Sequence, residues 1–242
     1  PGAPGPGALG LAPALTLAAM LGPVAAGLAG TLLPAFGWMP VLGMQAPGLS
    51  AFADLAAWPG FPRAVLLSLV TGLGATALSL GIVALVCAAW SGTRVFAALE
   101  RALSPLLSVP HAAAAFGLAF LISPSGWLMR LASPWATGLE RPPDWLIVQD
   151  PWGLSMIAGL VAKEVPFVLL MILAALGQTR PGQSLAVAQA LGYGRVTGWL
   201  KAVFPRVYPQ IRLPVYAVLA YSMSVVDVAV ILGPTTPPPL AV

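Results

Sequence analysis

The sequence predicts an all-α fold, a polytopic transmembrane helical bundle of about five spans. The first reason is composition, because 59% of the 242 residues are hydrophobic, only 7% are charged, and the mean hydropathy is +0.91. Soluble domains carry about 25% charged residues. The 11 basic and 7 acidic side chains are too few to cover a water-exposed surface. The outer surface is therefore expected to face lipid.

The second reason is the length of the apolar stretches. A helix needs about 20 apolar residues to cross a hydrocarbon core of ~30 Å. Five stretches meet this length, near residues 9–33, 63–90, 104–123, 151–176 and 210–233. We expect kinks at Pro13 and Pro23 in the first stretch and at Pro110 in the third. The opening string PGAPGPG has neither an initiator Met nor a basic segment, which favours a partial chain over a secretory signal.

The basic residues between the stretches predict the orientation. Residues 177–212 carry five basic side chains and no acidic one, and residues 91–103 carry two basic and one acidic. The connections at 34–62 and 124–150 together carry two basic and four acidic side chains. Cytoplasmic loops carry the excess of Lys and Arg. The amino terminus is therefore expected in the cytoplasm. The net charge of +4 is accounted for by these loops, so no nucleic-acid partner is expected.

The most informative stretch is the cytoplasmic loop at 177–209. Good helix formers at 183–191 are followed by Gly192 and Gly194, and apolar residues then recur at one-face helical spacing. We expect two short helices joined by a glycine bend. Their apolar stripe, exposed to the cytoplasm, comprises Val196, Trp199, Leu200 and Val203. Such a stripe outside the membrane needs a lipid surface or a partner groove.

These residues resemble the cytoplasmic "EAA" loop of the permease subunits of binding-protein-dependent ABC importers. In that family a Glu-Ala-Ala string precedes Leu-Gly, and two prolines four residues apart follow. The matching positions here are Ala186, Ala188, Leu191, Gly192, Trp199, Pro205 and Pro209. Ala186 stands where the family has its glutamate.

The resemblance covers most of residues 61–234. The strings SVPHAAAAFGLAFLISPSGW and GLVAKEVPF are similar to the thiamine and iron(III) branch, and especially to thiamine-type permeases in which two permease halves are fused. The resemblance implies a type I permease core in which residues 1–242 form the transmembrane domain, one half of a longer or two-half permease. Residues 177–209 would be its ATPase-coupling loop. The solute would be small and thiamine-like or similar, and the location a bacterial inner membrane.

The same resemblance implies the partners. These are two copies of an ATP-binding subunit, a second permease half, a periplasmic solute-binding protein and the lipid bilayer. The chain itself has no G-x-x-x-x-G-K-[ST] phosphate loop, because neither Lys163 nor Lys201 follows a glycine. ATP hydrolysis is therefore expected in another subunit. We expect no cofactor, and this chain is not expected to be an enzyme.

Lys163 and Glu164 lie near the middle of the fourth predicted span, and Asp227 lies in the fifth. A charge at such depth costs roughly 2.5 to 3.5 kcal/mol, so each should find a partner or a water-filled path. Neighbouring residues on a helix point about 100° apart. We expect either a buried ion pair that fixes packing, or one side chain facing the pathway while the other pairs with Asp227 or a backbone group.

The remaining motifs favour transport over catalysis. His111 is the chain's only histidine, with no Cys, Asp or Glu nearby in sequence, so no metal site is expected. We find no G-x-S-x-G, H-E-x-x-H or dinucleotide-binding string. An ion-coupled secondary transporter or channel that uses the three buried charges is the alternative function. The loop at 177–209 distinguishes the two, because an ion-driven carrier has no need of an ATPase-docking element.

Overall fold

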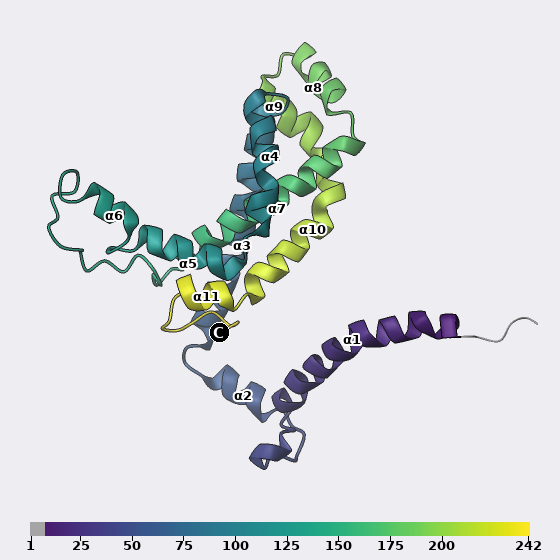
Figure 1. Cartoon of the computed structure of the whole chain (residues 1–242), viewed down its shortest axis with the longest axis vertical. Helices are drawn as coiled ribbons and strands as arrows, with labels where there is room; N and C mark the ends of the chain where they lie inside the picture. Colours follow the sequence, from purple (N-terminus) through teal and green to yellow (C-terminus); the bar gives the residue numbers. More distant parts are fainter. Residues whose placement is uncertain (1–7) are drawn as a thin grey trace, which may run out of the picture. The chain divides into compact units, whose positions relative to one another are not determined.

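The structure, a computed structural model, describes residues 8–242 as helices joined by turns and loops, with no β-strand in that range (Figure 1). The predicted all-α fold is confirmed. Contacts divide the chain into two compact units, one ending at Phe61 and one beginning at Pro62. Each unit is described by itself.

The first unit contains one long helix and two short ones. Helix α1 (Ala8–Ala35) is followed by the 3-10 turn η1 (Pro40–Leu42) and by α2 (Ser50–Ala57). The helix α1 continues through Pro13 and Pro23 and is drawn as a curved ribbon in Figure 1. Phe36, just after α1, packs against Phe52 of α2 with ring centroids 5.4 Å apart.

The second unit is a bundle arranged around α7. Its helices are α3 (Phe61–Trp90), α4 (Arg94–Ser108), α5 (His111–Ile122), α6 (Trp127–Ala132), α7 (Leu154–Gln178), α8 (Pro181–Ala190), α9 (Arg195–Gly198), the π-helical turn η2 (Trp199–Val203), α10 (Phe204–Ser224) and α11 (Asp227–Leu232). Helix α7 contacts α4, α5, α10 and α11. One buried apolar cluster joins α3, α4, α7, η2 and α10, and a second joins α5, α7 and α11.

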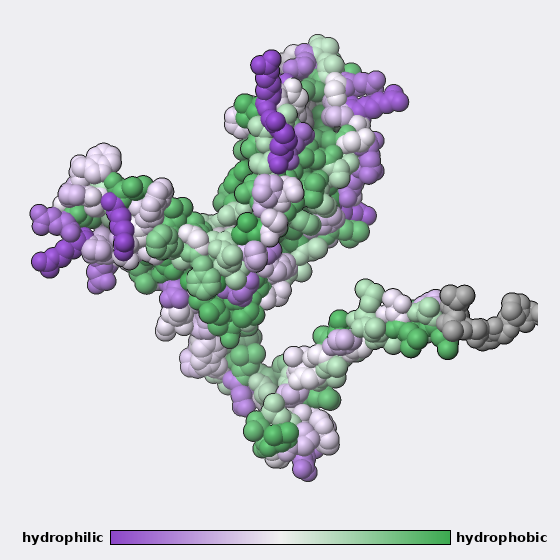
Figure 2. All heavy atoms as spheres, in the orientation of Figure 1, coloured by the Kyte–Doolittle hydropathy of each residue, from purple (hydrophilic) through white to green (hydrophobic). Residues whose placement is uncertain are grey.

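Four helical segments of the described chain are long and apolar enough to cross a membrane: Leu11–Ala35, Phe61–Trp90, His111–Ala132 and Leu154–Gln178. Figure 2 shows apolar residues over much of the visible surface of the bundle, with hydrophilic residues gathered near α8 and around α6. Apolar side chains on the outside of the bundle, such as Phe116 and Phe120, are more than 60% exposed. This distribution is what a lipid-facing bundle requires.

Two of the five predicted spans are not continuous helices in the structure, so the prediction is wrong for them. The stretch at 104–123 is divided between α4 and α5 at Val109, which adopts an extended conformation (ψ 126°) before Pro110. The residue before a proline is disfavoured in the helical region, and proline donates no backbone hydrogen bond. The break therefore replaces the kink expected at Pro110.

The stretch at 210–233 is divided in the same way. Helix α10 ends at Ser224, Val225 is extended (ψ 127°), and α11 begins at Asp227. Helix α10 also contains Arg206, Arg212 and Gln210, which lower its hydropathy below that of the four candidate spans. Asp227 is thus at a helix start, where its Oδ1 accepts a hydrogen bond from the Val228 N–H at 2.9 Å.

The start of α7 is held by Asp150, which lies outside the apolar segments and is buried. Its carboxylate accepts hydrogen bonds from the backbone N–H groups of Trp152, Leu154 and Ser155, at 3.1, 2.9 and 2.8 Å. The Ser155 hydroxyl lies 2.9 Å from the same carboxylate and 2.7 Å from the carbonyl of Leu232 at the end of α11. Asp150 therefore caps α7 and orients the residue that joins α7 to α11.

Replacing Asp150 with Ala should lower the free energy of unfolding by about 1 to 3 kcal/mol, because buried N–H groups lose their acceptor. Thermal unfolding of the detergent-purified protein measures this. The exposed Asp144→Ala variant is the matched control, and an equal loss there would contradict the assignment.

The same interaction sets a pH dependence. Burial opposes ionisation of Asp150, but the hydrogen bonds from Ser155, Leu154 and Trp152 outweigh it, so the pKa lies below the ordinary value of 3.8. The stabilisation is thus complete above pH 3.8 and is lost as the pH falls through the lower pKa of the folded state. The difference in unfolding temperature between the wild type and Asp150→Ala should shrink over that acid range.

Candidate functional site

The predicted coupling loop folds as two short helices joined by a glycine bend. Pro181 begins α8, where its missing N–H costs nothing. Gly192 follows α8 with φ +88°, a conformation that favours glycine, and the N–H of Tyr193 bonds to the carbonyl of Ala188 at 3.1 Å. The chain then continues through α9 and η2 directly into α10.

The prediction of an exposed apolar stripe is wrong, because the main residues of that stripe face the bundle. Trp199 and Val203 are each only 1% exposed and belong to the cluster that contains Cys87 and Phe96. The π-helical turn η2 at 199–203 directs them inward. Burial of a tryptophan against α3 and α4 gains more apolar contact than a cytoplasmic surface offers. Trp199 therefore joins the loop to the bundle.

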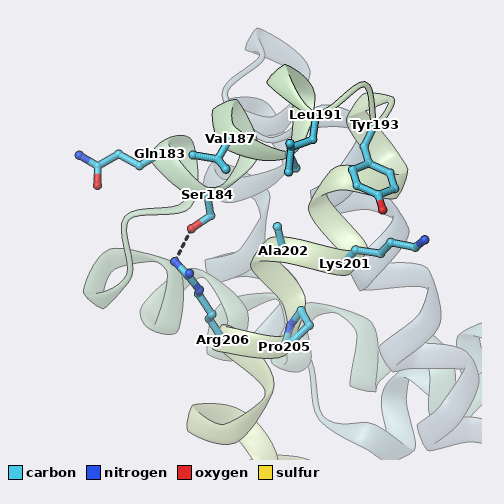
Figure 3. Close-up of a pocket in the computed structure, with 10 residues that line it drawn as sticks. Gln183, Ser184, Val187, Leu191, Tyr193, Lys201, Ala202, Pro205 and Arg206 are labelled. Atoms are coloured by element: carbon cyan, nitrogen blue, oxygen red, sulfur yellow. Dashed lines mark hydrogen bonds between the residues drawn. The ribbon is translucent and has the colours of Figure 1, made fainter.

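The loop instead exposes a groove between α8 and the beginning of α10, of about 630 Å³ (Figure 3). Its apolar lining includes Val187 and Leu191, which are 63% and 74% exposed, together with Pro205. Its polar rim includes Lys201 and Arg206. This groove is the surface of the loop that a partner could occupy.

The seven motif positions do not all meet in the groove. Ala188, Leu191 and Pro205 line it, and Gly192 forms the bend beside it. Trp199 is in the core. Ala186 and Pro209 are exposed but do not line the groove.

Two arginines fasten the loop, and nothing in the sequence around them predicts this role. Arg206 of α10 donates from Nη1 to the Ser184 hydroxyl of α8 at 2.7 Å. Arg195 of α9 donates from Nε to the Ala89 carbonyl at 3.0 Å and from Nη2 to the Ser91 carbonyl. These carbonyls lie at the end of α3, where a helix favours a cation. Arg195 thereby binds the loop to α3, and Arg206 binds α8 to α10.

A second hollow, of about 320 Å³, lies beside α7 and is lined by the two charged residues of that helix. It is lined by Lys163, Glu164, Phe167, His111 and Tyr221, among others. Lys163 and Glu164 are only 7% and 4% exposed. The His111 and Tyr221 rings pack with centroids 4.8 Å apart, so this histidine has an aromatic neighbour.

Lys163 is bound to the backbone. Its Nζ donates to the carbonyls of Leu106 and Val109, at 2.8 and 2.7 Å. These groups lie at the break after α4, where a helix leaves carbonyls without partners. The backbone partner expected for one of the two charges is therefore present for Lys163.

Glu164 is bound differently. Its Oε1 accepts a hydrogen bond from the Ser222 hydroxyl of α10, and the buried Ser79 of α3 also lies beside its carboxyl group. Asp227 is exposed and accepts a hydrogen bond from its own neighbour Val228. The hydrogen bonds of these three residues in the described chain join none of them to another. Lys163 and Glu164 thus bind different helices, yet both line one hollow.

The fold and the two hollows define the class as a polytopic helical membrane protein with a two-helix loop fastened to its spans. Over 197 residues the chain is 35% identical to the "Inner membrane ABC transporter permease protein YnjC" of Escherichia coli (strain K12). The aligned region is 80% of this chain and 36% of that protein, so the chain spans about a third of the relative's length. No protein-family model matches the chain.

The chain is therefore similar to an inner-membrane ABC transporter permease, in agreement with the resemblance of the loop. The relative's name specifies no solute, so the thiamine-type branch gains no support from it. The similarity and the apolar helices support a multi-pass protein of the bacterial inner membrane.

The fit between α8 and α9 generates a prediction about Gly198. A Cβ there would lie 3.2 Å from the Ala188 Cβ and 3.3 Å from the Leu185 Cδ1. Gly198→Val should push α8 away and cost about 1 to 3 kcal/mol of stability. Thermal unfolding and the rate of maleimide labelling of buried Cys87 measure the effect.

Gly194→Val is the matched control, because nothing lies within 4 Å of a Cβ there and its φ is −62°. Equal labelling rates in the two variants would show that the close approach of α8 does not support the core.

Proposed function

We propose that this chain is the membrane-spanning permease part of an ATP-driven importer. The observation that carries the proposal is the loop itself, an exposed groove on an element whose other side is buried in the bundle through Trp199. Force applied to such a loop is transmitted to the spans, because the loop cannot move independently of the residues that bury Trp199.

The hydrogen bonds of the loop favour the same function. Arg195 connects the loop to α3, and Arg206 connects α8 to α10. An ATP-hydrolysing subunit that binds the groove would therefore act on both α3 and α10. An ion-driven carrier has no need of this arrangement.

The proposal includes the partners of such an importer. The groove would bind one of two ATP-binding subunits, and a second permease half, fused or separate, would complete the pathway. A periplasmic solute-binding protein would dock on the opposite side. The excess of basic residues at 177–212 favours a cytoplasmic loop and a cytoplasmic amino terminus.

The proposed solute is small, and a thiamine-like solute is the first to test. The two strings that resemble the thiamine-type branch supply His111, Lys163, Glu164 and Phe167, and all four line the hollow of about 320 Å³. This volume is at the lower end of the ~300 to 1,000 Å³ typical of ligand sites. The solute would pass beside these side chains.

Replacing Leu191 and Gly192 together with Asp should release the ATP-binding subunit. Two carboxylates beside the apolar lining would weaken docking at least tenfold, which corresponds to about 1.4 kcal/mol. The measurement is co-purification of the natural full-length protein with ATPases of the same source, followed by identification of a subunit that carries the G-x-x-x-x-G-K-[ST] loop.

Gln189→Asp is the matched control, because Gln189 is exposed on α8 but does not line the groove. If neither the wild type nor the control captures such a subunit, the importer proposal fails and the ion-coupled carrier becomes the leading function.

The alternative, an ion-coupled carrier, is favoured by one observation, the buried carboxyl group of Glu164 in the lining of the hollow of about 320 Å³. Under the importer proposal, uptake into membrane vesicles should require ATP and persist when an ionophore collapses the ion gradients. An ion-coupled carrier would instead take up solute without ATP and stop when the ionophore collapses the ion gradients.

Glu164→Gln should reduce uptake about tenfold without changing capture of the ATP-binding subunit, because it replaces a carboxyl group that lines the hollow. Glu100→Gln, on the exposed side of α4, is the matched control. Unchanged uptake after replacement of both Lys163 and Glu164 by Leu would exclude these residues from the pathway.

A further inference from the structure

The groove of the loop carries positive charge that no acidic residue balances. Lys201 and Arg206 lie on its rim, and none of the residues that line it is acidic. The whole stretch 177–212 contains five basic residues and no Asp or Glu. A surface of this kind attracts carboxylates and repels basic partners.

The two cations are held in place before any partner arrives. The Lys201 Nζ lies 4.9 Å from the centroid of the Tyr193 ring, and Arg206 Nη1 is bonded to the Ser184 hydroxyl (Figure 3). The remaining guanidinium N–H groups of Arg206 are available for a further acceptor. Preorganised charges lose less conformational entropy on binding than freely extended ones.

The lining between the cations is concave and apolar. Val187 and Leu191 are mostly exposed, and Pro205 lies below them across the groove in Figure 3. The groove's volume of about 630 Å³ is well within the ~300 to 1,000 Å³ range of sites that enclose a ligand. A layer of lipid headgroups could neutralise the cations but would not fill an apolar hollow. A protein segment with one apolar and one acidic side chain satisfies both.

We propose that this groove receives a segment of the ATP-hydrolysing subunit in which an Asp or Glu side chain binds Lys201 while an apolar neighbour contacts Leu191. The inference rests on the proposed function and adds the chemistry of the contact. The charges of this contact are reversed relative to the family motif, in which the permease carries a glutamate. Ala186 stands at that position here. The permease supplies the cations and the ATPase supplies the carboxylate.

Carbodiimide cross-linking tests the contact directly, because it joins a lysine amine to a carboxylate without a spacer. The chain has only two lysines, and Lys163 is buried with its Nζ bonded to two carbonyls, so coupling in this chain reports on Lys201. In the complex of the natural full-length protein with its captured ATPase, mass spectrometry should find Lys201 joined to an Asp or Glu of the subunit that carries the phosphate loop.

Three variants complete the experiment. Lys201→Arg keeps the charge and should lose the cross-link while capture of the ATPase stays within about twofold of wild type. Lys201→Glu should reduce capture about tenfold or more. Arg180→Glu, the matched control, makes the same change of charge at an exposed residue that does not line the groove, and it should leave capture within about twofold of wild type.

The inference is overturned if Lys201→Glu captures the ATPase as well as the wild type does, and in that case the importer proposal survives. It is also overturned if Lys201→Glu and Arg180→Glu weaken capture equally, or if Lys201→Glu weakens only retention on phosphatidylglycerol vesicles, which would assign the cations to lipid. If the wild type captures no ATPase, the importer proposal and this inference fail together.

Discussion

The hydrogen bonds from Lys163 to the carbonyls of Leu106 and Val109 are the interaction on which the bundle depends. The break between α4 and α5 leaves backbone carbonyls without partners beside the middle of α7. Unsatisfied backbone groups are too costly in apolar surroundings to persist. A cation from α7 satisfies two of them, and the ends of α4 supply the partial negative charge that makes a buried lysine tolerable. The break, the lysine and the hollow therefore form one unit.

This arrangement separates the roles of two neighbouring charges. Lys163 binds backbone carbonyls after α4, whereas the neighbours of the Glu164 carboxyl group are the side chains of Ser222 and Ser79 on α10 and α3. The fold requires Lys163 at this position, because its hydrogen bonds satisfy the carbonyls of Leu106 and Val109. Glu164 lines the hollow of about 320 Å³, and buried ionisable residues inside membrane-spanning helices are typically functional.

The loop likewise has a buried side and an exposed side. Trp199 and Arg195 attach it to α3 and to the core, while Leu191, Lys201 and Arg206 remain on the groove. An element that is buried on one face and open on the other can pass movement from a partner to the spans. The two hollows are thus connected through a continuous body of helices, since α10 begins at the groove and ends near Glu164.

The sequence alone determined the helical membrane class, because composition and the length of apolar runs depend only on residue type. It also determined the glycine bend at Gly192, which local backbone sterics require. It did not determine that the segments at 104–123 and 210–233 break, since hydropathy treats Val109 and Val225 as ordinary apolar residues. Only the tertiary structure decided that Trp199 faces inward, because the alternative faces of a short helix differ in what packs against them and not in their sequence. The partners of Lys163, Arg195 and Arg206 come from segments 22 to 106 residues away in the chain, and no local pattern encodes such contacts.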